Sequence, residues 1–170
     1  MGMMEILGRY AEPRRSILPR DVEQDFGSVV HEAGLDAMQD GIAEAFRADE
    51  TPEFEEMVAT LFEHSDPHVR AGLLDSLLAG LAPSARFQGG GSALSDVWRK
   101  YHAGARVPVD RTAEVAPADV EDVARHAREE NSGVLERVSR FYARHPEVAR
   151  SLGAVAMNII LARIARRGHH

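Results

Sequence analysis

Two histidines come nearest, by residue type and spacing, to forming a metal site. His64 and His68 are four positions apart, a spacing that places two ligands on one face of a helix. Pro67 and Ser65, which we predict to be a helix cap, lie between them, and the run Ser65-Asp66-Pro67 is typical of a helix start. We therefore expect the two imidazoles on different helices or in the turn between them. They complete no metal motif, and we predict no metal and no other cofactor.

The remaining chemistry-bearing residues also form no catalytic set. The chain has no cysteine, which excludes thiolate zinc sites, cysteine nucleophiles and disulfides. No glutamate is followed three positions later by a histidine, so the di-iron bundle pattern is absent. The run of glycines at 89–91 lacks the lysine of a phosphate-binding loop. Three pairs of acidic residues are expected on solvated helix faces: Glu55-Glu56, Glu121-Asp122 and Glu129-Glu130. We predict that the protein is not an enzyme.

The elements that position these residues are predicted to be helices throughout. Apolar residues recur at spacings of three and four, and Ala, Leu, Glu and Arg are abundant. One helix is expected from residue 20 to 33 with Gly34 as its C-terminal cap, and others are expected to start at Thr51-Pro52 and at Asp66-Pro67. The last is expected to begin at Pro146 and continue to the basic end of the chain. The fold class is all-α, a bundle of helical hairpins.

Charge divides the chain into two parts. Residues 1–85 hold six arginines against 17 acidic residues, whereas residues 86–170 hold 13 arginines and one lysine against 10. A glycine-rich segment, 84–93, lies at the division. We therefore predict an acidic helical module at 1–83 and a basic one at 94–168. Opposite charges can attract within one molecule or between copies, and the overall net charge of −7 disfavours nucleic acid.

The terminal helix supplies the predicted interaction surface. Its nearly apolar stretch, 152–162, is too short to span a membrane, and its apolar residues cover too much of the circumference for a helix lying on a membrane surface. Small residues, including Gly153, would let a second helix approach. The predicted interaction residues are Leu152, Val155, Ala156, Ile159, Ile160, Arg163, Arg166 and Arg167.

Two segments resemble a known group of bacterial proteins. One runs from Ala45 to Val58 and is followed by the residues at 70–74; the other runs from Val138 to Ile164 and contains an aromatic–His–Pro joint. Both resemble the YidB-like helical proteins of unknown function, and the resemblance covers about two thirds of the chain. It implies a bacterial, helical protein and no established activity, cofactor or catalytic residue.

These observations lead to a non-enzymatic structural or interaction protein. We expect it to self-associate as a homo-oligomer, or to bind another protein, through helical surfaces and its oppositely charged modules. The alternative is a helical protein that binds a metal or small molecule between the modules, with Trp98 or Tyr142 lining a pocket that holds His64, His68, His126 and His145. Residues 1–10 show no secretory signal, so a cytoplasmic location is expected.

Overall fold

The computed structural model describes residues 3–10, 19–79, 81, 97–99, 101, 107, 109–131 and 133–168. Within these residues every regular element is a helix, so the predicted all-α class is confirmed. The longer helices are α1 (Met3–Tyr10), α2 (Pro19–Val29), α3 (Leu35–Arg47), α4 (Phe54–Glu63), α5 (Pro67–Leu78), α7 (Pro117–Glu130), α8 (Val134–Ala143) and α10 (Ala154–Gly168). Shorter helices are η1 (Val109–Glu114), α9 (Pro146–Ala149) and η2 (Arg150–Leu152). None of the described helices is long and apolar enough to cross a membrane.

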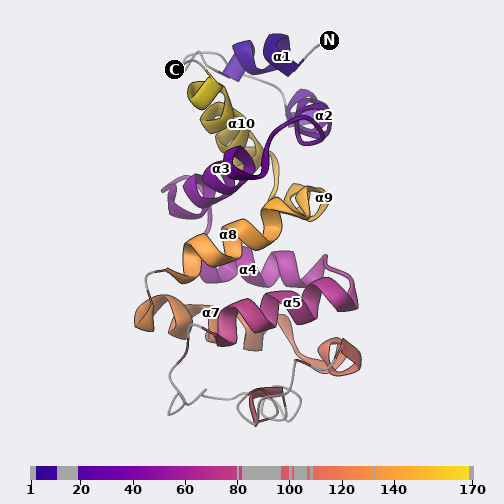
Figure 1. Ribbon diagram of the computed structural model, residues 1–170, viewed down its shortest axis with the longest axis vertical. Helices are drawn as coiled ribbons and strands as arrows, with labels where there is room; N and C mark the ends of the chain where they lie inside the picture. The colour runs from indigo at the N-terminus through magenta and orange to yellow at the C-terminus, as the bar shows by residue number, and fades with distance from the viewer. Residues whose placement is uncertain are drawn as a thin grey trace.

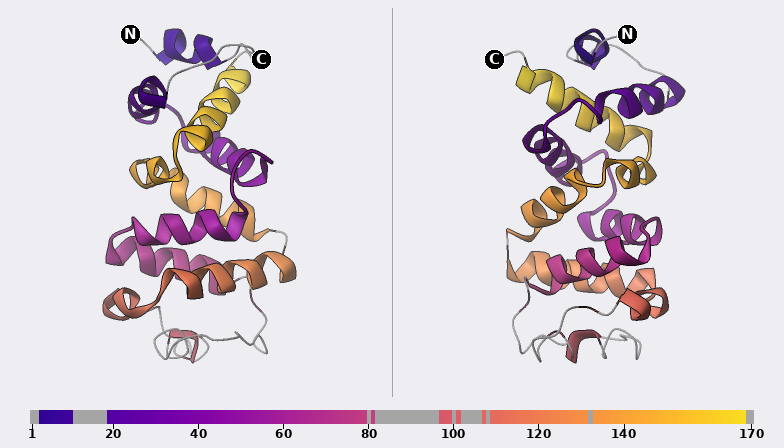
Figure 2. Two further views of the ribbon diagram at one scale, coloured as in Figure 1. Left: turned by 180° about the vertical axis from the view of Figure 1, so that it is seen from behind. Right: turned by 45° about the vertical axis from the view of Figure 1, so that its right-hand side comes forward.

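The helices are stacked along the long axis of the molecule (Figure 1). α1, α2, α3 and α10 lie at one end and α4, α5 and α7 lie toward the other, with α8 between the two groups; the views in Figure 2 agree. α3 packs on both α10 and α8, while α4 packs on α7 and α5 packs on α8. α8 therefore joins the two ends into one stack.

Side chains from both sequence halves share one hydrophobic core. Phe26 and Ile42 are fully buried together with Ile160, and Leu73 and Val123 belong to the same core. Residues 1–83 and 94–168 consequently do not pack as separate modules, because α10 covers α3 and α7 covers α4. An amphipathic helix specifies which of its faces is buried but not which helix covers that face. The glycine-rich segment 84–93 lies outside the described residues.

Two helix ends differ from the prediction because glycine serves either end of a helix. α2 ends at Val29, and the Ala33 amide then donates to the Val29 carbonyl in a turn. Gly34 does not cap α2; it is the N-cap of α3, with an ordinary φ of −71°. The terminal helix is also broken. Gly153 adopts a φ of +96°, a conformation that glycine tolerates best, and separates η2 from α10.

Two of the predicted helix starts at proline have different outcomes. α5 begins at Pro67 as expected, but its cap is Asp66, whose side chain accepts a hydrogen bond from the Val69 amide at 2.9 Å. The Ser65 hydroxyl, the predicted cap, donates instead to the Leu61 carbonyl. The Thr51 side chain does not cap α4, whose N-cap is Glu53. Its hydroxyl instead lies 2.6 Å from the carbonyl oxygen of Ala45 and closes the C-terminal end of α3. Thr51 therefore marks the end of one helix, whereas the sequence predicts the start of the next.

Candidate functional site

An open groove of about 950 Å³ lies between α3 and α10. α3 and the turn after it line the groove with Gln39, Asp40, Ala43, Glu44, Arg47, Ala48, Asp49 and Glu50. α10 lines it with Val155, Asn158, Ile159, Ala162, Arg163 and Arg166, and Tyr10 and Glu136 contribute from α1 and α8. Since an α-helix rises about 1.5 Å per residue, the stretch 39–47 gives the groove a length of about 12 Å.

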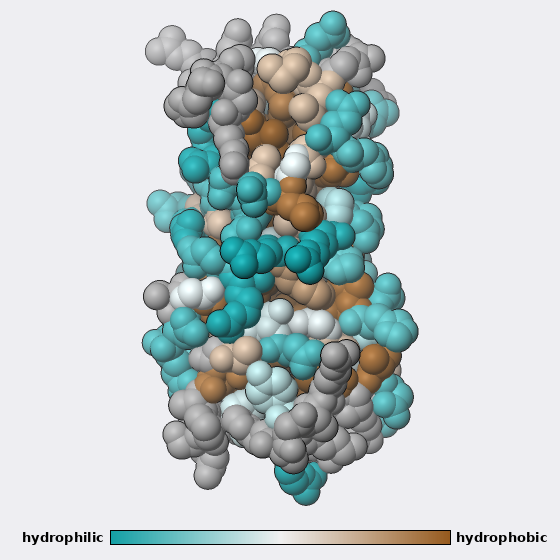
Figure 3. All heavy atoms as spheres, in the orientation of Figure 1, coloured by the Kyte–Doolittle hydropathy of each residue, from teal (hydrophilic) through white to brown (hydrophobic). Residues whose placement is uncertain are grey.

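One face of α10 forms an apolar strip in this groove. Val155 is 53% exposed, and Ile159 and Ala162 are half-buried. These three side chains follow one another at spacings of four and three, which places them on a single face of the helix. Two further large apolar side chains of the described residues are exposed, Met4 at 58% and Leu35 at 55%, and neither lines the groove. Figure 3 shows one face, on which the most hydrophilic residues gather across the middle, where α8 lies in Figure 1.

The predicted interaction residues separate into exposed and buried sets. Ala156 and Ile160 are fully buried inside the chain's own core, so the prediction that they contact another molecule is corrected. The reason is that α10 must cover α1, α2 and α3 at once, which uses most of its apolar circumference. Leu152 is half-buried in η2 and does not line the groove. The side chain of Arg167 lies outside the described part of the chain.

Ion pairs between the two sequence halves hold the rim of the groove. Nη2 of Arg166 donates to both carboxylate oxygens of Glu44, at 2.6 and 2.7 Å. Arg47 pairs with Glu136 across the gap from α3 to α8. The attraction between Glu44 in the acidic half and Arg166 in the basic half is therefore made within one chain.

The groove nevertheless carries an excess of negative charge. Its acidic side chains are Asp40, Glu44, Asp49, Glu50 and Glu136, and its basic ones are Arg47, Arg163 and Arg166. Among the described residues that line the groove, five carboxylates against three guanidinium groups give a formal charge of −2. Asp49 and Glu50 are exposed and directly follow the C-terminal end of α3, where the helix dipole adds further negative potential. The acidic end of the groove is therefore the turn from α3 to α4.

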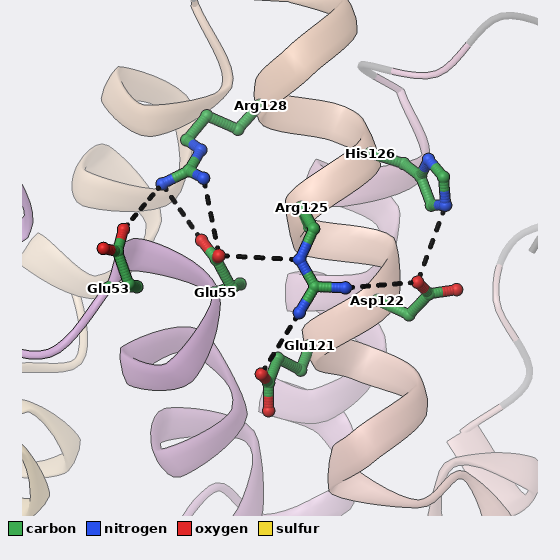
Figure 4. A network of polar contacts seen from close by, with 7 residues as sticks. All are labelled: Glu53, Glu55, Glu121, Asp122, Arg125, His126 and Arg128. Atoms are coloured by element: carbon green, nitrogen blue, oxygen red, sulfur yellow. Dashed lines mark hydrogen bonds and ion pairs between the residues drawn. The ribbon is translucent and has the colours of Figure 1, made fainter.

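A second polar cluster, centred on Glu55, connects α4 to α7 (Figure 4). Oε2 of Glu55 lies 3.0 Å from Nη1 of Arg128, and Oε1 lies 3.6 Å from Nε of Arg125. Arg128 also reaches Glu53, at 3.4 Å. Glu55 is only 6% exposed, so its prediction as a solvated helix charge is wrong. The carboxylate lies in the first turn of α4, where the helix dipole also favours a negative charge.

The α7 side of this cluster extends the network along that helix. Arg125 contacts Glu121 at 3.3 Å and Asp122 at 3.6 Å, and the same Asp122 oxygen lies 3.5 Å from Nε2 of His126. Glu121, Asp122, Arg125 and His126 line neither the groove nor a smaller hollow of about 340 Å³ beside α4. Arg128 and Glu53 do line that smaller hollow. The cluster therefore holds α4 and α7 together, and its Glu53–Arg128 end borders the smaller hollow.

The chain matches no known family. Comparison with protein-family models, with curated proteins and with solved structures gives no match. The resemblance to the YidB-like proteins thus stays a prediction, and function has to be argued from geometry.

The histidines do not converge on a site. His64 and His68 are both exposed, and Nδ1 of His64 donates to the Thr60 carbonyl at 2.9 Å. His145 packs against the ring of Phe141, at 5.1 Å between ring centroids, whereas His126 lies on α7. Among the described residues no three His, Asp or Glu side chains are grouped to hold a metal ion.

Tyr142, the other predicted pocket residue, belongs to the core. It is fully buried, and its hydroxyl lies 3.1 Å from Oγ of Ser65 in the turn between α4 and α5. The Ser65 hydroxyl donates to the Leu61 carbonyl at 2.6 Å, so the tyrosine donates to the serine. Burial raises the pKa of the Tyr142 phenol well above its ordinary value of 10.0, against the opposing effects of Ser65 and Arg70. Trp98 packs at the edge of the core and does not line the groove.

Proposed function

We propose that this chain is a non-enzymatic interaction protein whose groove between α3 and α10 binds a polypeptide partner. The observation that carries the proposal is the apolar strip formed by exposed Val155 and half-buried Ile159 and Ala162, which lies between the charged residues that line the groove. An apolar floor with a polar rim is the anatomy of a protein-binding surface. The groove residues that were not predicted from the sequence are those of α3 and the turn after it, together with Tyr10, Asn158, Ala162 and Glu136.

The partner that fits this groove is another protein and not a second copy. Glu44 and Arg166 already use their charges within one chain. Two copies meeting at this groove would bring together two surfaces of formal charge −2, and like charges oppose association. The predicted attraction between copies through opposite halves therefore loses its basis at this surface.

A small ligand fits the groove less well. Small-molecule sites enclose most of the surface of their ligand, whereas this groove is open along one side. None of the six polar and aromatic side chains expected to build a pocket between modules lines the groove. The alternative function therefore has no geometric support at its predicted residues.

The absence of cysteine allows a direct test of the groove. An environment-sensitive dye is attached to N158C in the groove or to H68C on α5, which is exposed and distant from it. Each labelled protein is mixed with three short amphipathic helical peptides whose polar faces carry lysine, glutamine or glutamate. We expect at least one peptide to change the emission at position 158 and leave position 68 unchanged.

A matched pair of variants shows whether the apolar strip is responsible. V155D in the N158C protein is expected to abolish the response, whereas L35D is expected to preserve it, because Leu35 is 55% exposed but lies outside the groove. No response to any peptide, or an equal loss in both variants, contradicts the proposal. An emission change on dilution of the protein alone would identify a second copy as the occupant.

A further inference from the structure

The charge of the groove specifies the chemistry of its partner. Resting on the proposed function, we infer that the occupant is a basic amphipathic helical segment of another protein. Asp49 and Glu50 supply two exposed carboxylates at the end of α3, and the C-terminal carbonyl groups of that helix add to their negative potential. Lysine or arginine side chains on the partner complement this end of the groove.

The apolar strip specifies the shape of the partner. Val155, Ile159 and Ala162 occupy about 10 Å along α10, at a rise of about 1.5 Å per residue. This length accommodates about two turns of a second helix, whose apolar face would lie on the strip as in other helix-in-groove complexes. A polycation without an apolar face would satisfy only the carboxylates.

The positive charge of Arg163 should affect binding of a basic peptide in the opposite direction to Asp49 and Glu50. Arg163 is exposed, and among the described side chains no carboxylate pairs with it, in contrast to Arg47 and Arg166. It therefore opposes a cationic segment. Removing its charge in R163Q should strengthen binding of the lysine peptide, whereas removing the carboxylates at positions 49 and 50 should weaken it.

Binding of the three peptides to the unlabelled full-length chain, measured by titration calorimetry, tests the inference. We expect the lysine peptide to bind at least about tenfold more tightly than the glutamate peptide at low salt, because the two differ in charge sign at an acidic surface. D49N/E50Q should weaken lysine-peptide binding by about three- to tenfold, since exposed ion pairs contribute about 0.2–1 kcal/mol each. R163Q should strengthen it by about twofold.

The matched control also removes two negative charges, but from residues that do not line the groove. E32Q/E63Q changes two exposed carboxylates on other surfaces and should alter binding by less than about twofold once salt screens distant charges. Spermine serves as a polycation without an apolar face and should not compete with the lysine peptide at equal concentration.

The possible results distinguish an error in the chemistry of the partner from an error in the proposed binding surface. Equal or tighter binding of the glutamate peptide, or equal losses in D49N/E50Q and E32Q/E63Q, overturns the basic partner and leaves the groove as a binding surface. Competition by spermine as effective as that of the peptide assigns the groove to small polycations and overturns the helical segment. Failure of all three peptides to bind overturns both proposals.

Discussion

Gly41 of α3 lies directly against Ile160 of α10. A Cβ atom at position 41 would lie 2.8 Å from Cγ2 of Ile160 and 3.1 Å from its carbonyl oxygen. Both distances are shorter than normal contacts, and Ile160 is fully buried and cannot move aside. The absence of a side chain at position 41 therefore sets the distance between the two helices that form the groove.

Adding a methyl group at this crossing should destabilise the protein. We expect G41A to lower the free energy of unfolding by about 1–2 kcal/mol, because overpacking costs about 1–3 kcal/mol and the better helix propensity of alanine offsets up to about 1 kcal/mol. Denaturant unfolding measures the change. G27A is the control, since a Cβ there meets only the flexible end of Arg150, and it should be neutral or stabilising. Equal destabilisation by both variants would contradict the close crossing.

The hydrogen bond between Ser65 and Tyr142 predicts an asymmetric pair of variants. Y142F leaves the Ser65 hydroxyl bonded to the Leu61 carbonyl, so it should cost about 0.5–1.5 kcal/mol. S65A leaves the buried phenol without its partner and should cost about 1–3 kcal/mol. The double variant should be more stable than the sum of the two losses predicts. Additive losses in thermal unfolding would show that the two hydroxyl groups do not interact.

Burial of Tyr142 also predicts a loss of stability in alkali. Its pKa is raised in the folded chain, so between pH 10 and the higher folded value the unfolded state releases a proton that the folded state retains. This contribution to stability is complete below pH 10 and is lost as the pH rises, by up to about 1.4 kcal/mol per pH unit. The free energy of unfolding should therefore fall less steeply above about pH 10 in Y142F than in the wild type. Parallel curves would contradict the buried phenol.

The buried and exposed ion pairs should differ in strength and salt dependence. The side chain of Glu55 is 8% exposed, whereas those of Glu44 and Arg166 are 36% and 51% exposed. A double-mutant cycle for Glu55 and Arg128 should give a coupling above about 1 kcal/mol that salt changes little. The cycle for Glu44 and Arg166 should give about 0.2–1 kcal/mol, and it should decrease in high salt. Equal couplings in both cycles would show that burial does not strengthen the Glu55 cluster.

Local patterns in the sequence predict individual helices well. The proline at 67 places the start of α5 correctly, although its cap is Asp66 and not Ser65, and spacings of three and four identify the buried face of most helices. Gly34, Thr51 and Gly153 are misplaced because glycine and threonine act at either end of a helix. Only tertiary packing decides which end they serve.

Only the α10 side of the candidate site could be predicted from the sequence. Val155, Ile159, Arg163 and Arg166 are predicted interaction residues, and the structure places all four in the groove. Their neighbours on α3 are not predicted, because the side of a helix that borders another helix depends on contacts between distant segments. The spacing of Asp40, Glu44 and Arg47 on one face of α3 is the signal that could have indicated this surface.

The proposed binding site for a basic helix is the groove between α3 and α10. Backbone amide shifts of the full-length, ¹⁵N-labelled chain, followed by NMR during titration with the lysine peptide, test it most directly. The claim predicts that the largest shifts fall at 39–50 and at 155–166, with α5 and α7 unchanged. Shifts centred on α5 or α7, or spread evenly over acidic residues of the whole surface, would contradict it.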